Sequence, residues 1–286
     1  MIAEQLTDPV VYHGEGAHWH EPWGGVRWVD MLAGDVLFRS DATGEIRRTP
    51  TGSRVAAMVR PRTGGGLVVA TERGFLLWDA AEREEWRSAD LIPADARFNE
   101  GAIDPLGRVL CGTIHDSREP GSADVWRLGV DRGATRILDG VTISNGLGFA
   151  ADGSRAFYVD SRTRRVDVFD VDADGELVAR RPFVVVPDEV VGNPDGLCVD
   201  AEGGVWVAFY NGGAARHYDR DGRLDAVVEV PGVSRVTSCA LGGSSGTTLY
   251  LTTSREGLDD EAEPSAGALF VATADAPAVP VREAAL

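Results

Sequence analysis

Short apolar runs rich in Val, Leu, Phe and Trp, separated by turns that contain Gly and Asp, dominate this chain. Runs of this length between turn residues predict β-strands, and long helical periodicity is scarce. One stretch shows the pattern clearly, with strand-like runs over 145–149, 156–160 and 165–170 and the turn Ala151-Asp152-Gly153 between the first two. The pattern therefore predicts an all-β protein.

The same order of strand, turn and strand recurs along the chain. Units that begin near 15, 100 and 195 resemble the one that begins near 145, and two weaker units cover 55–78 and 237–271. A repeat of roughly 42–50 residues with about four strands is typical of propeller blades. We therefore expect one six-bladed β-propeller with four-stranded blades over residues 1–286. Two sandwich domains, the alternative, would not predict an ordered recurrence.

The ends of the chain complete this expectation. Residues near 10–12 precede the first unit and are predicted to pair with the last blade, which would close the ring and remove an open sheet edge. Residues 277–286 are predicted to form a last strand and a short tail.

Four units begin with a dipeptide that ends in Gly, namely Glu15-Gly16, Glu100-Gly101, Asn145-Gly146 and Asp195-Gly196. Asn-Gly and Asp-Gly favour hairpin turns, but each unit has its own hairpin turn several residues later. The dipeptides stand instead at the entrance to the first strand, which lines the central channel in a propeller. We therefore expect side chains from several blades to converge at one mouth of the channel.

Glu15, Asn145 and Asp195 form a candidate metal site at that mouth. Two carboxylates that are brought together and buried repel each other unless a cation neutralises them. The amide oxygen of Asn145 would add a neutral ligand. Oxygen ligands suit Ca²⁺, Mg²⁺ or Mn²⁺ better than a structural zinc ion.

Composition excludes several classes of function. The formal net charge of −17 repels the phosphates of nucleic acids and anionic membrane surfaces. Every basic residue is Arg, so Schiff-base chemistry and a P-loop lysine are excluded. No apolar run is long enough to span a bilayer, and residues 1–16 lack the pattern of a signal peptide, so a cytoplasmic location is expected.

Other reactive side chains have structural explanations. Cys111, Cys198 and Cys239 lie in apolar runs without a CxxC motif, which favours core packing over a zinc site or disulfides. A predicted propeller does not offer the strand–turn–helix setting in which a G-x-S-x-G motif presents a serine nucleophile. His115 lies in a loop near the predicted mouth, where it is a candidate for substrate contact, with a structural role as the alternative.

A set of short strings occurs in a fixed order over nearly the whole chain, at residues 13–19, 97–101, 144–147, 157–161, 194–200, 206–213 and 236–239. Each string is weak by itself. Together they resemble the senescence-marker-protein/gluconolactonase family, also called regucalcin-like.

The resemblance implies a six-bladed propeller that hydrolyses sugar lactones with one divalent metal ion. It places the metal ligands of the family on Glu15, Asn145 and Asp195. It places two substrate contacts on Arg97 and Asn99. The family often carries a further, acidic substrate contact, and the corresponding position here is Ser117. Two neighbouring acids are candidates to replace it, and these are Asp116 and Glu119. Both Ca²⁺ and Zn²⁺ occur in the family, and Ca²⁺ is the expected ion here, with Zn²⁺, Mg²⁺ and Mn²⁺ as alternatives.

The sequence thus leads to the hypothesis of a metal-dependent lactonase in which Asp195 acts as general base. The expected partner is a small lactone, and the protein is expected to be a monomer or a weak homo-oligomer. Two alternatives remain open, because a fold alone does not choose its chemistry. One is a non-catalytic calcium- or sugar-binding propeller, and the other is a hydrolase of other small esters or organophosphates.

Overall fold

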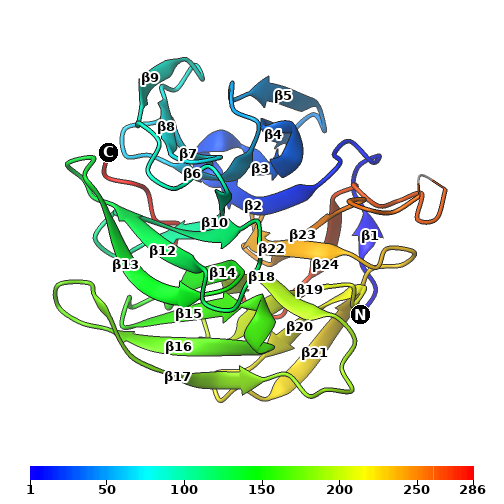
Figure 1. Ribbon diagram of the computed structural model, residues 1–286. Coiled ribbons are helices and arrows are strands. Elements are labelled where there is room, and N and C mark those ends of the chain that lie inside the picture. Colours follow the sequence, from blue (N-terminus) through cyan, green and yellow to red (C-terminus); the bar gives the residue numbers. More distant parts are fainter. Residues whose placement is uncertain (260) are drawn as a thin grey trace.

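The computed structural model describes residues 1–259 and 261–286, and these residues form six antiparallel sheets of four strands each. The sheets stand in a ring around a central axis and follow one another in chain order (Figure 1). This confirms the prediction of a six-bladed β-propeller with four-stranded blades. No helix in the described part of the chain is long and apolar enough to cross a membrane.

Blades 1 to 3 follow one another from the N-terminal side. Their strands are β2 (Gly14–His20), β3 (Gly25–Asp30), β4 (Asp35–Ser40) and β5 (Ile46–Pro50); β6 (Ala56–Pro61), β7 (Leu67–Thr71), β8 (Phe75–Trp78) and β9 (Glu84–Arg87); and β10 (Ala96–Ile103), β11 (Val109–His115), β12 (Ala123–Leu128) and β13 (Ala134–Val141). Two short 3-10 turns, η1 (Glu21–Trp23) and η2 (Met31–Ala33), connect strands of blade 1.

Blades 4 to 6 complete the ring. Their strands are β14 (Ser144–Phe149), β15 (Arg155–Asp160), β16 (Arg165–Val171) and β17 (Leu177–Val185); β18 (Asn193–Val199), β19 (Val205–Tyr210), β20 (Ala214–Tyr218) and β21 (Leu224–Glu229); and β22 (Val236–Gly242), β23 (Thr248–Thr253), β24 (Phe270–Thr273) and β1 (Glu4–Gln5). A further 3-10 turn, η3 (Ser161–Thr163), joins β15 to β16.

The ring is closed by β1, which pairs with β24 through Glu4 opposite Val271 and Gln5 opposite Phe270. The prediction that residues 10–12 form the closing strand is therefore wrong. Residues 10–12 do contact the last blade, because Val10 and Val11 donate to the carbonyl of Gly267 at 3.1 and 3.3 Å and Tyr12 accepts from Arg255 at 2.9 Å, but they form no strand. The segment then leads into blade 1, where the carboxylate of an aspartate at the end of β3 accepts from the main-chain N–H groups of residues 12 and 13.

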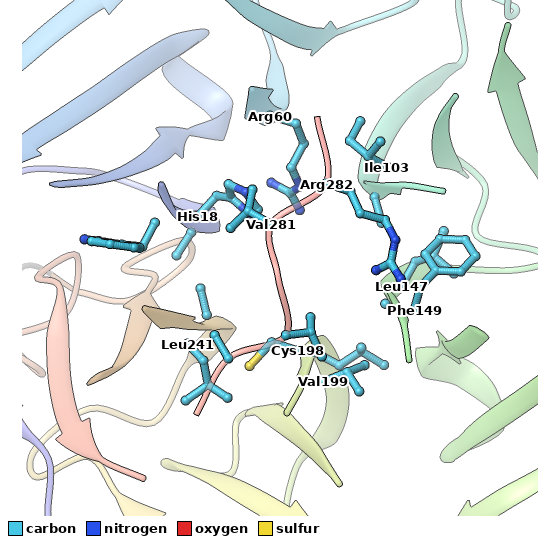
Figure 2. Close-up of a pocket in the computed structure, with 18 of the residues that line it drawn as sticks. His18, Arg60, Ile103, Leu147, Phe149, Cys198, Val199, Leu241, Val281 and Arg282 are labelled. Atoms are coloured by element: carbon cyan, nitrogen blue, oxygen red, sulfur yellow. The ribbon is translucent and has the colours of Figure 1, made fainter. Parts of the chain in front are cut away.

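The C-terminal segment, predicted to begin as a strand, forms no strand beyond β24 in the described residues. It crosses the end of the channel instead (red in Figure 2), and its main chain bonds to several blades in turn. Ala278 donates to Gly246 at 2.8 Å, and Ala284 donates to Pro61 at 2.8 Å. Pro277 and Pro280 lack the N–H group that a sheet strand needs, which explains the wrong prediction.

The first strands of the blades surround the axis, and neighbouring first strands contact one another around the ring (Figure 1). All six carry a break in register against the second strand of their blade. In blades 1, 3, 4 and 5 the breaks lie between Glu15 and His18, Phe98 and Gly101, Ser144 and Leu147, and Pro194 and Leu197. A β-bulge leaves residues unpaired and re-aims their side chains, often next to an active site. The bulges therefore turn polar side chains from several blades toward the axis at the same height.

The glycines of the recurring dipeptides allow this arrangement. A Cβ atom on Gly146 would lie 2.5 Å from the main-chain nitrogen of Leu197 on the neighbouring blade. Gly16 has a φ of +57°, in the left-handed region that other residues adopt at a cost. The Gly positions in the sequence pattern thus reflect close strand packing and strand bending at the bulges.

Candidate active site

A cavity of about 400 Å³ lies at the end of the channel where the bulges present their side chains. This size suits a small organic ligand. The three predicted metal ligands all line this cavity. The two predicted substrate contacts, Arg97 and Asn99, line it as well. The lining residues are His13, Glu15, Arg97, Asn99, Ile114, Arg118, Ile143, Asn145, Ser161, Arg162, Arg164, Asn193, Asp195, Tyr210, Asn211 and Glu256.

A chain of hydrogen bonds fixes the amide of Asn145. Its Nδ2 donates to Ser161 Oγ at 2.9 Å, and that hydroxyl donates to the carbonyl of Pro194 at 2.7 Å. On the other side, Asn99 Nδ2 donates to Asn145 Oδ1 at 3.1 Å, and Arg97 Nη1 donates to Asn99 Oδ1 at 2.6 Å. These contacts turn the amide oxygen of Asn145 toward Asn99 and hold all three cavity side chains in one orientation.

The two carboxylates of the cavity are deeply buried, with Glu15 3% and Asp195 5% exposed. Asp195 Oδ1 has no hydrogen-bond partner among the described residues. Burial above all, and then the charges of Asp195 and Glu100, raise the pKa of Glu15 well above its usual value. Burial and the charge of Glu100 likewise raise the pKa of Asp195. The protein alone therefore holds two unneutralised acids close together.

The donor atoms of this cavity fit a hard divalent cation. Glu15 and Asp195 supply carboxylate oxygens and Asn145 supplies an amide oxygen, which are the ligand types of Ca²⁺ and Mg²⁺. A cation here would offset the burial and repulsion that raise the pKa values of both acids. Within residues 1–259 and 261–286, no group of three or more His, Cys, Asp or Glu side chains is arranged to hold a metal ion.

Ser161→Ala tests the role of the Asn145 support. We expect the variant to bind Ca²⁺ about 10–100-fold more weakly, because the amide loses the acceptor that orients it. Isothermal titration of the purified protein with CaCl₂ measures the affinity. Ser154→Ala, at an exposed turn of the same blade, is the control that should leave binding unchanged. Equal affinity of Ser161→Ala and wild type would contradict the role.

Two aspartates at equivalent places in blades 1 and 4 position the first strands. Asp30 ends β3 and its carboxylate accepts from the N–H of His13 at 3.1 Å. Asp160 ends β15 and accepts from the N–H of Ile143 at 3.1 Å. Each therefore ties the segment that precedes a bulge to the neighbouring strand, which fixes where the metal-ligand side chain of that blade emerges.

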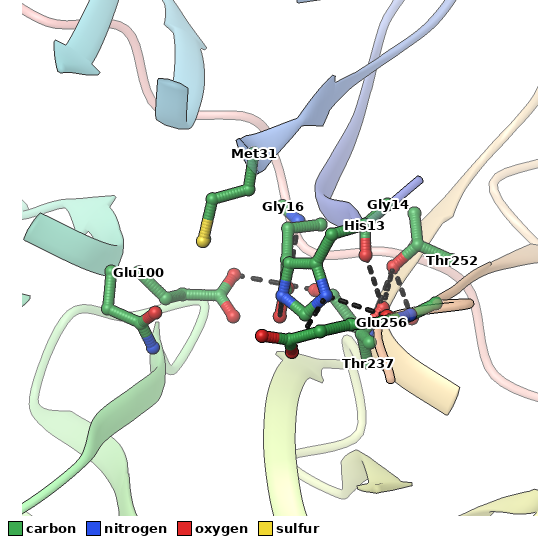
Figure 3. Close-up of polar contacts among 12 residues, drawn as sticks. His13, Gly14, Gly16, Met31, Glu100, Thr237, Thr252 and Glu256 are labelled. Carbon is green, nitrogen blue, oxygen red and sulfur yellow. Dashed lines mark hydrogen bonds and ion pairs between the residues drawn. The ribbon is translucent and has the colours of Figure 1, made fainter. Parts of the chain in front are cut away.

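His13 is a site residue that sequence reasoning did not single out. Its Nδ1 lies 2.7 Å from Ser254 Oγ and 3.5 Å from Glu256, and its Nε2 lies 3.7 Å from Glu15 Oε1 (Figure 3). Burial, followed by two nearby arginine charges, lowers the pKa of His13 to about 3, so the ring is neutral. The sequence signal for it is the spacing, because residues 13 and 15, two apart in an extended segment, point to the same side.

Blade 3 departs from the dipeptide pattern by one residue. Its bulge exposes Asn99 to the cavity, whereas Glu100 lines a smaller cavity of about 120 Å³ on the far side of the channel. There Glu100 lies 3.6 Å from Arg60 and accepts from Ser238 Oγ at 3.4 Å. In this blade the residue that faces the cavity is therefore Asn99, one position before the residue that the Glu100-Gly101 dipeptide predicts.

The turn that follows β11 holds the predicted acidic substrate contacts. Asp116, Ser117 and Glu119 are not among the lining residues of the cavity, whereas Arg118 between them is. His115 supports the turn, with Nδ1 2.9 Å from Ser117 Oγ. The contact of Asp116 or Glu119 with substrate stays a prediction.

Known proteins resemble this chain along most of its length. Residues 13–255 match the SMP-30/Gluconolactonase/LRE-like region. Regucalcin of Danio rerio is 34% identical over 267 residues, which cover 91% of this chain and 90% of that protein. Pentonolactonase XacC of Haloferax volcanii is 34% identical over 281 residues, or 94% of each chain. A structure of a calcium-binding protein, regucalcin, from Agrobacterium tumefaciens superposes with a TM-score of 0.90 at 25% identity, covering 99% of this chain and 97% of that one.

Proposed function

This chain belongs to the SMP-30/gluconolactonase/LRE-like family, and on that premise we propose that it is a metal-dependent sugar lactonase. One observation carries the proposal, which is the buried acid pair of Glu15 and Asp195 with an unpartnered Asp195 oxygen in a ligand-sized cavity. A relative that is 34% identical is named a pentonolactonase, which supports a sugar lactone as substrate.

Glu15, Asn145 and Asp195 would hold one divalent cation. Ca²⁺ is the preferred ion, because all three donors are oxygen atoms, and Zn²⁺, Mg²⁺ and Mn²⁺ are alternatives. When bound, the cation supplies Lewis-acid polarisation of the lactone carbonyl and charge that stabilises its developing oxyanion. The side chains of the cavity perform the remaining tasks.

Asp195 acts as general base in this proposal. Its Oδ1, which no protein group occupies among the described residues, takes a proton from a water molecule as the water oxygen bonds to the carbonyl carbon. The bond between that carbon and the ring oxygen then breaks. The proton on Asp195 passes to the leaving ring oxygen, so the product is the open hydroxy acid and Asp195 is a carboxylate again.

Arg97 and Asn99 orient the substrate. The guanidinium of Arg97 is fixed by Asn99 at 2.6 Å and by Met31 Sδ at 3.0 Å. Among the described residues it has no carboxylate oxygen within 4.0 Å, so its remaining N–H groups are available to a lactone carbonyl or hydroxyl. Holding the carbonyl next to Asp195 converts the attack of water into a step between positioned groups.

A second candidate function is calcium binding without turnover. It is favoured by the structural likeness to the Agrobacterium protein, which is described as calcium-binding. The same three ligands would serve it. The two functions differ in whether the cavity converts a lactone.

A pH-stat assay with purified protein separates the two functions. Glucono- and xylonolactone are supplied with Ca²⁺, with chelator, and with Ca²⁺ restored after chelation. We expect the protein to release acid faster than the lactone hydrolyses spontaneously. Chelator should abolish this excess rate and added Ca²⁺ should restore it, because the chelator removes the Lewis acid. Calcium binding without turnover of any lactone would contradict the lactonase proposal and support the second candidate.

A further inference from the structure

The active-site cavity concentrates positive charge in an acidic protein. The whole chain has a formal net charge of −17, yet four arginines line this cavity, namely Arg97, Arg118, Arg162 and Arg164. The acids that line it are Glu15, Asp195 and Glu256. A divalent cation would neutralise the first two, which leaves Glu256 against the arginines. A neutral sugar lactone offers no charge with which this excess could pair.

Arg118 and Arg162 are the two of these arginines that protein groups leave available. Both are exposed, and in the described part of the chain neither has a carboxylate oxygen within 4.0 Å. Arg164 differs, because its guanidinium donates to the carbonyls of Gly192 at 2.7 Å and Val190 at 2.8 Å and so holds a loop. Arginines elsewhere on the surface commonly pair with acids, as Arg48 does with an aspartate at 2.6 Å.

A fixed turn presents Arg118. The residue has a φ of +50°, and its N–H donates to the carbonyl of His115 at 2.9 Å. The His115 ring accepts from the N–H of Ser117 at 3.2 Å and lies 3.3 Å from Asp95 through its other nitrogen. A non-glycine residue in the left-handed region carries strain, and such residues cluster at ligand-binding sites. The turn therefore holds Arg118 at the cavity in a conformation that a free loop would avoid.

Arg162 is presented from the neighbouring blade. It lies on η3, where the carboxylate of Asp160 accepts from its N–H at 3.3 Å. An isolated bridge between Ile114 and Ile143 joins the ends of blades 3 and 4 and adds an apolar wall to the cavity. The two available arginines thus reach the cavity from adjoining blades.

The charge of Arg118 also acts inside the cavity. Burial chiefly, and to a lesser extent the charge of Arg118, lowers the pKa of Arg97, while the charges of Glu15 and Glu256 raise it. Arg97 and Arg118 line the same cavity, so an anion held by Arg118 would lie in the cavity where Arg97 orients the substrate.

We propose, on the premise of the lactonase function above, that the preferred substrate is a sugar lactone with an anionic group, a carboxylate or a phosphate remote from the lactone carbonyl, which Arg118 and Arg162 bind. Guanidinium groups match both kinds of anion through paired N–H donors. At the turn where the resemblance implied an acidic substrate contact, the cavity receives a cation from Arg118. The specificity is therefore expected to be opposite in charge to the one that an acidic contact would favour.

The test compares three lactones in the presence of saturating Ca²⁺. They are glucono-1,5-lactone, which is neutral, glucaro-1,4-lactone, which carries a carboxylate, and 6-phosphoglucono-1,5-lactone, which carries a phosphate. We expect kcat/KM for at least one of the charged lactones to exceed that of the neutral one by about tenfold or more, since hydrogen bonds between charged groups contribute this much. Whichever charged lactone is favoured identifies the anion.

The arginines are tested with Arg118→Gln, Arg162→Gln and the double variant. We expect the ratio of kcat/KM between charged and neutral lactone to fall about tenfold or more in the double variant, mainly through KM. Arg220→Gln, at an exposed hairpin between β20 and β21, removes the same charge elsewhere and should keep the wild-type ratio. As a measurement free of any folding defect, higher ionic strength should lower the wild-type ratio.

The outcomes separate this proposal from the lactonase function. Hydrolysis of the neutral lactone with no preference for either charged one, or a preference that the double variant retains, would overturn the proposal and leave the lactonase function intact. Absence of turnover on all three lactones would overturn both.

Discussion

Replacement of Asp195 by Asn is expected to lower kcat for lactone hydrolysis by about 10³-fold. The change keeps the shape of the side chain but removes a carboxylate whose buried Oδ1 has no hydrogen-bond partner among the described residues. General-base catalysis alone contributes about 10²–10⁴-fold, and the variant also exchanges a charged metal ligand for a neutral one. Initial rates of acid release from gluconolactone, followed by pH-stat at saturating Ca²⁺, measure the effect.

Saturation with Ca²⁺ separates the loss of the base from weaker metal binding, so the Ca²⁺ affinity of Asp195→Asn is determined in parallel. Asp221→Asn is the matched control, because this aspartate lies exposed at a hairpin of the same blade and should leave kcat unchanged. A wild-type rate from Asp195→Asn would show that another group accepts the proton.

Glu15→Gln is expected to have opposite effects on stability and on metal binding. In the metal-free protein it removes a carboxylate that is destabilised by burial and, after that, by repulsion from Asp195 and Glu100, and relief of roughly 1–2 kcal/mol would raise Tm by about 2–6 °C. Wild type at about 100 times the Kd for Ca²⁺ should gain about 2.7 kcal/mol, whereas Glu15→Gln should lose most of that gain. Thermal unfolding with chelator and with excess Ca²⁺ measures both effects.

The buried carboxyl group of Glu15 should also make the stability of the metal-free protein depend on pH. Because the folded state raises the pKa of Glu15 above 4.5, the folded metal-free protein binds protons more tightly than the unfolded chain. Its stability should therefore fall as the pH rises above about 4.5, and Glu15→Gln should show a shallower fall. Glu229→Gln, at an exposed strand end, is the control that should follow wild type. A lower Tm for metal-free Glu15→Gln, or an undiminished Ca²⁺ gain, would contradict the account.

Much of this fold could be predicted from the sequence, because the signals are local and repeated. The spacing of turn residues and apolar runs predicted six blades of four strands, which the sheet order confirms. The recurring dipeptides mark the bulges in blades 1, 4 and 5, so the sequence pattern predicts that Glu15, Asn145 and Asp195 meet, and all three line one cavity.

The features that sequence reasoning missed depend on contacts between distant segments. Blade 6 is completed by Glu4 and Gln5, and a two-residue strand has too little pattern to be recognised. In blade 3 the bulge begins one residue earlier than the Glu100-Gly101 dipeptide suggests, and only pairing with β11 shows this register. Arg118 reaches the cavity because of the backbone conformation of one turn, and that conformation has no recognisable pattern in the sequence.

The central claim is that Glu15, Asn145 and Asp195 together hold one divalent cation. Diffraction data from crystals grown with Mn²⁺, collected for anomalous scattering, test it most directly, because the signal locates the ion without relying on activity. We predict a single strong anomalous peak within coordination distance of oxygen atoms from all three side chains. A cavity that holds only solvent under these conditions, or a peak bound by other residues, would contradict the account.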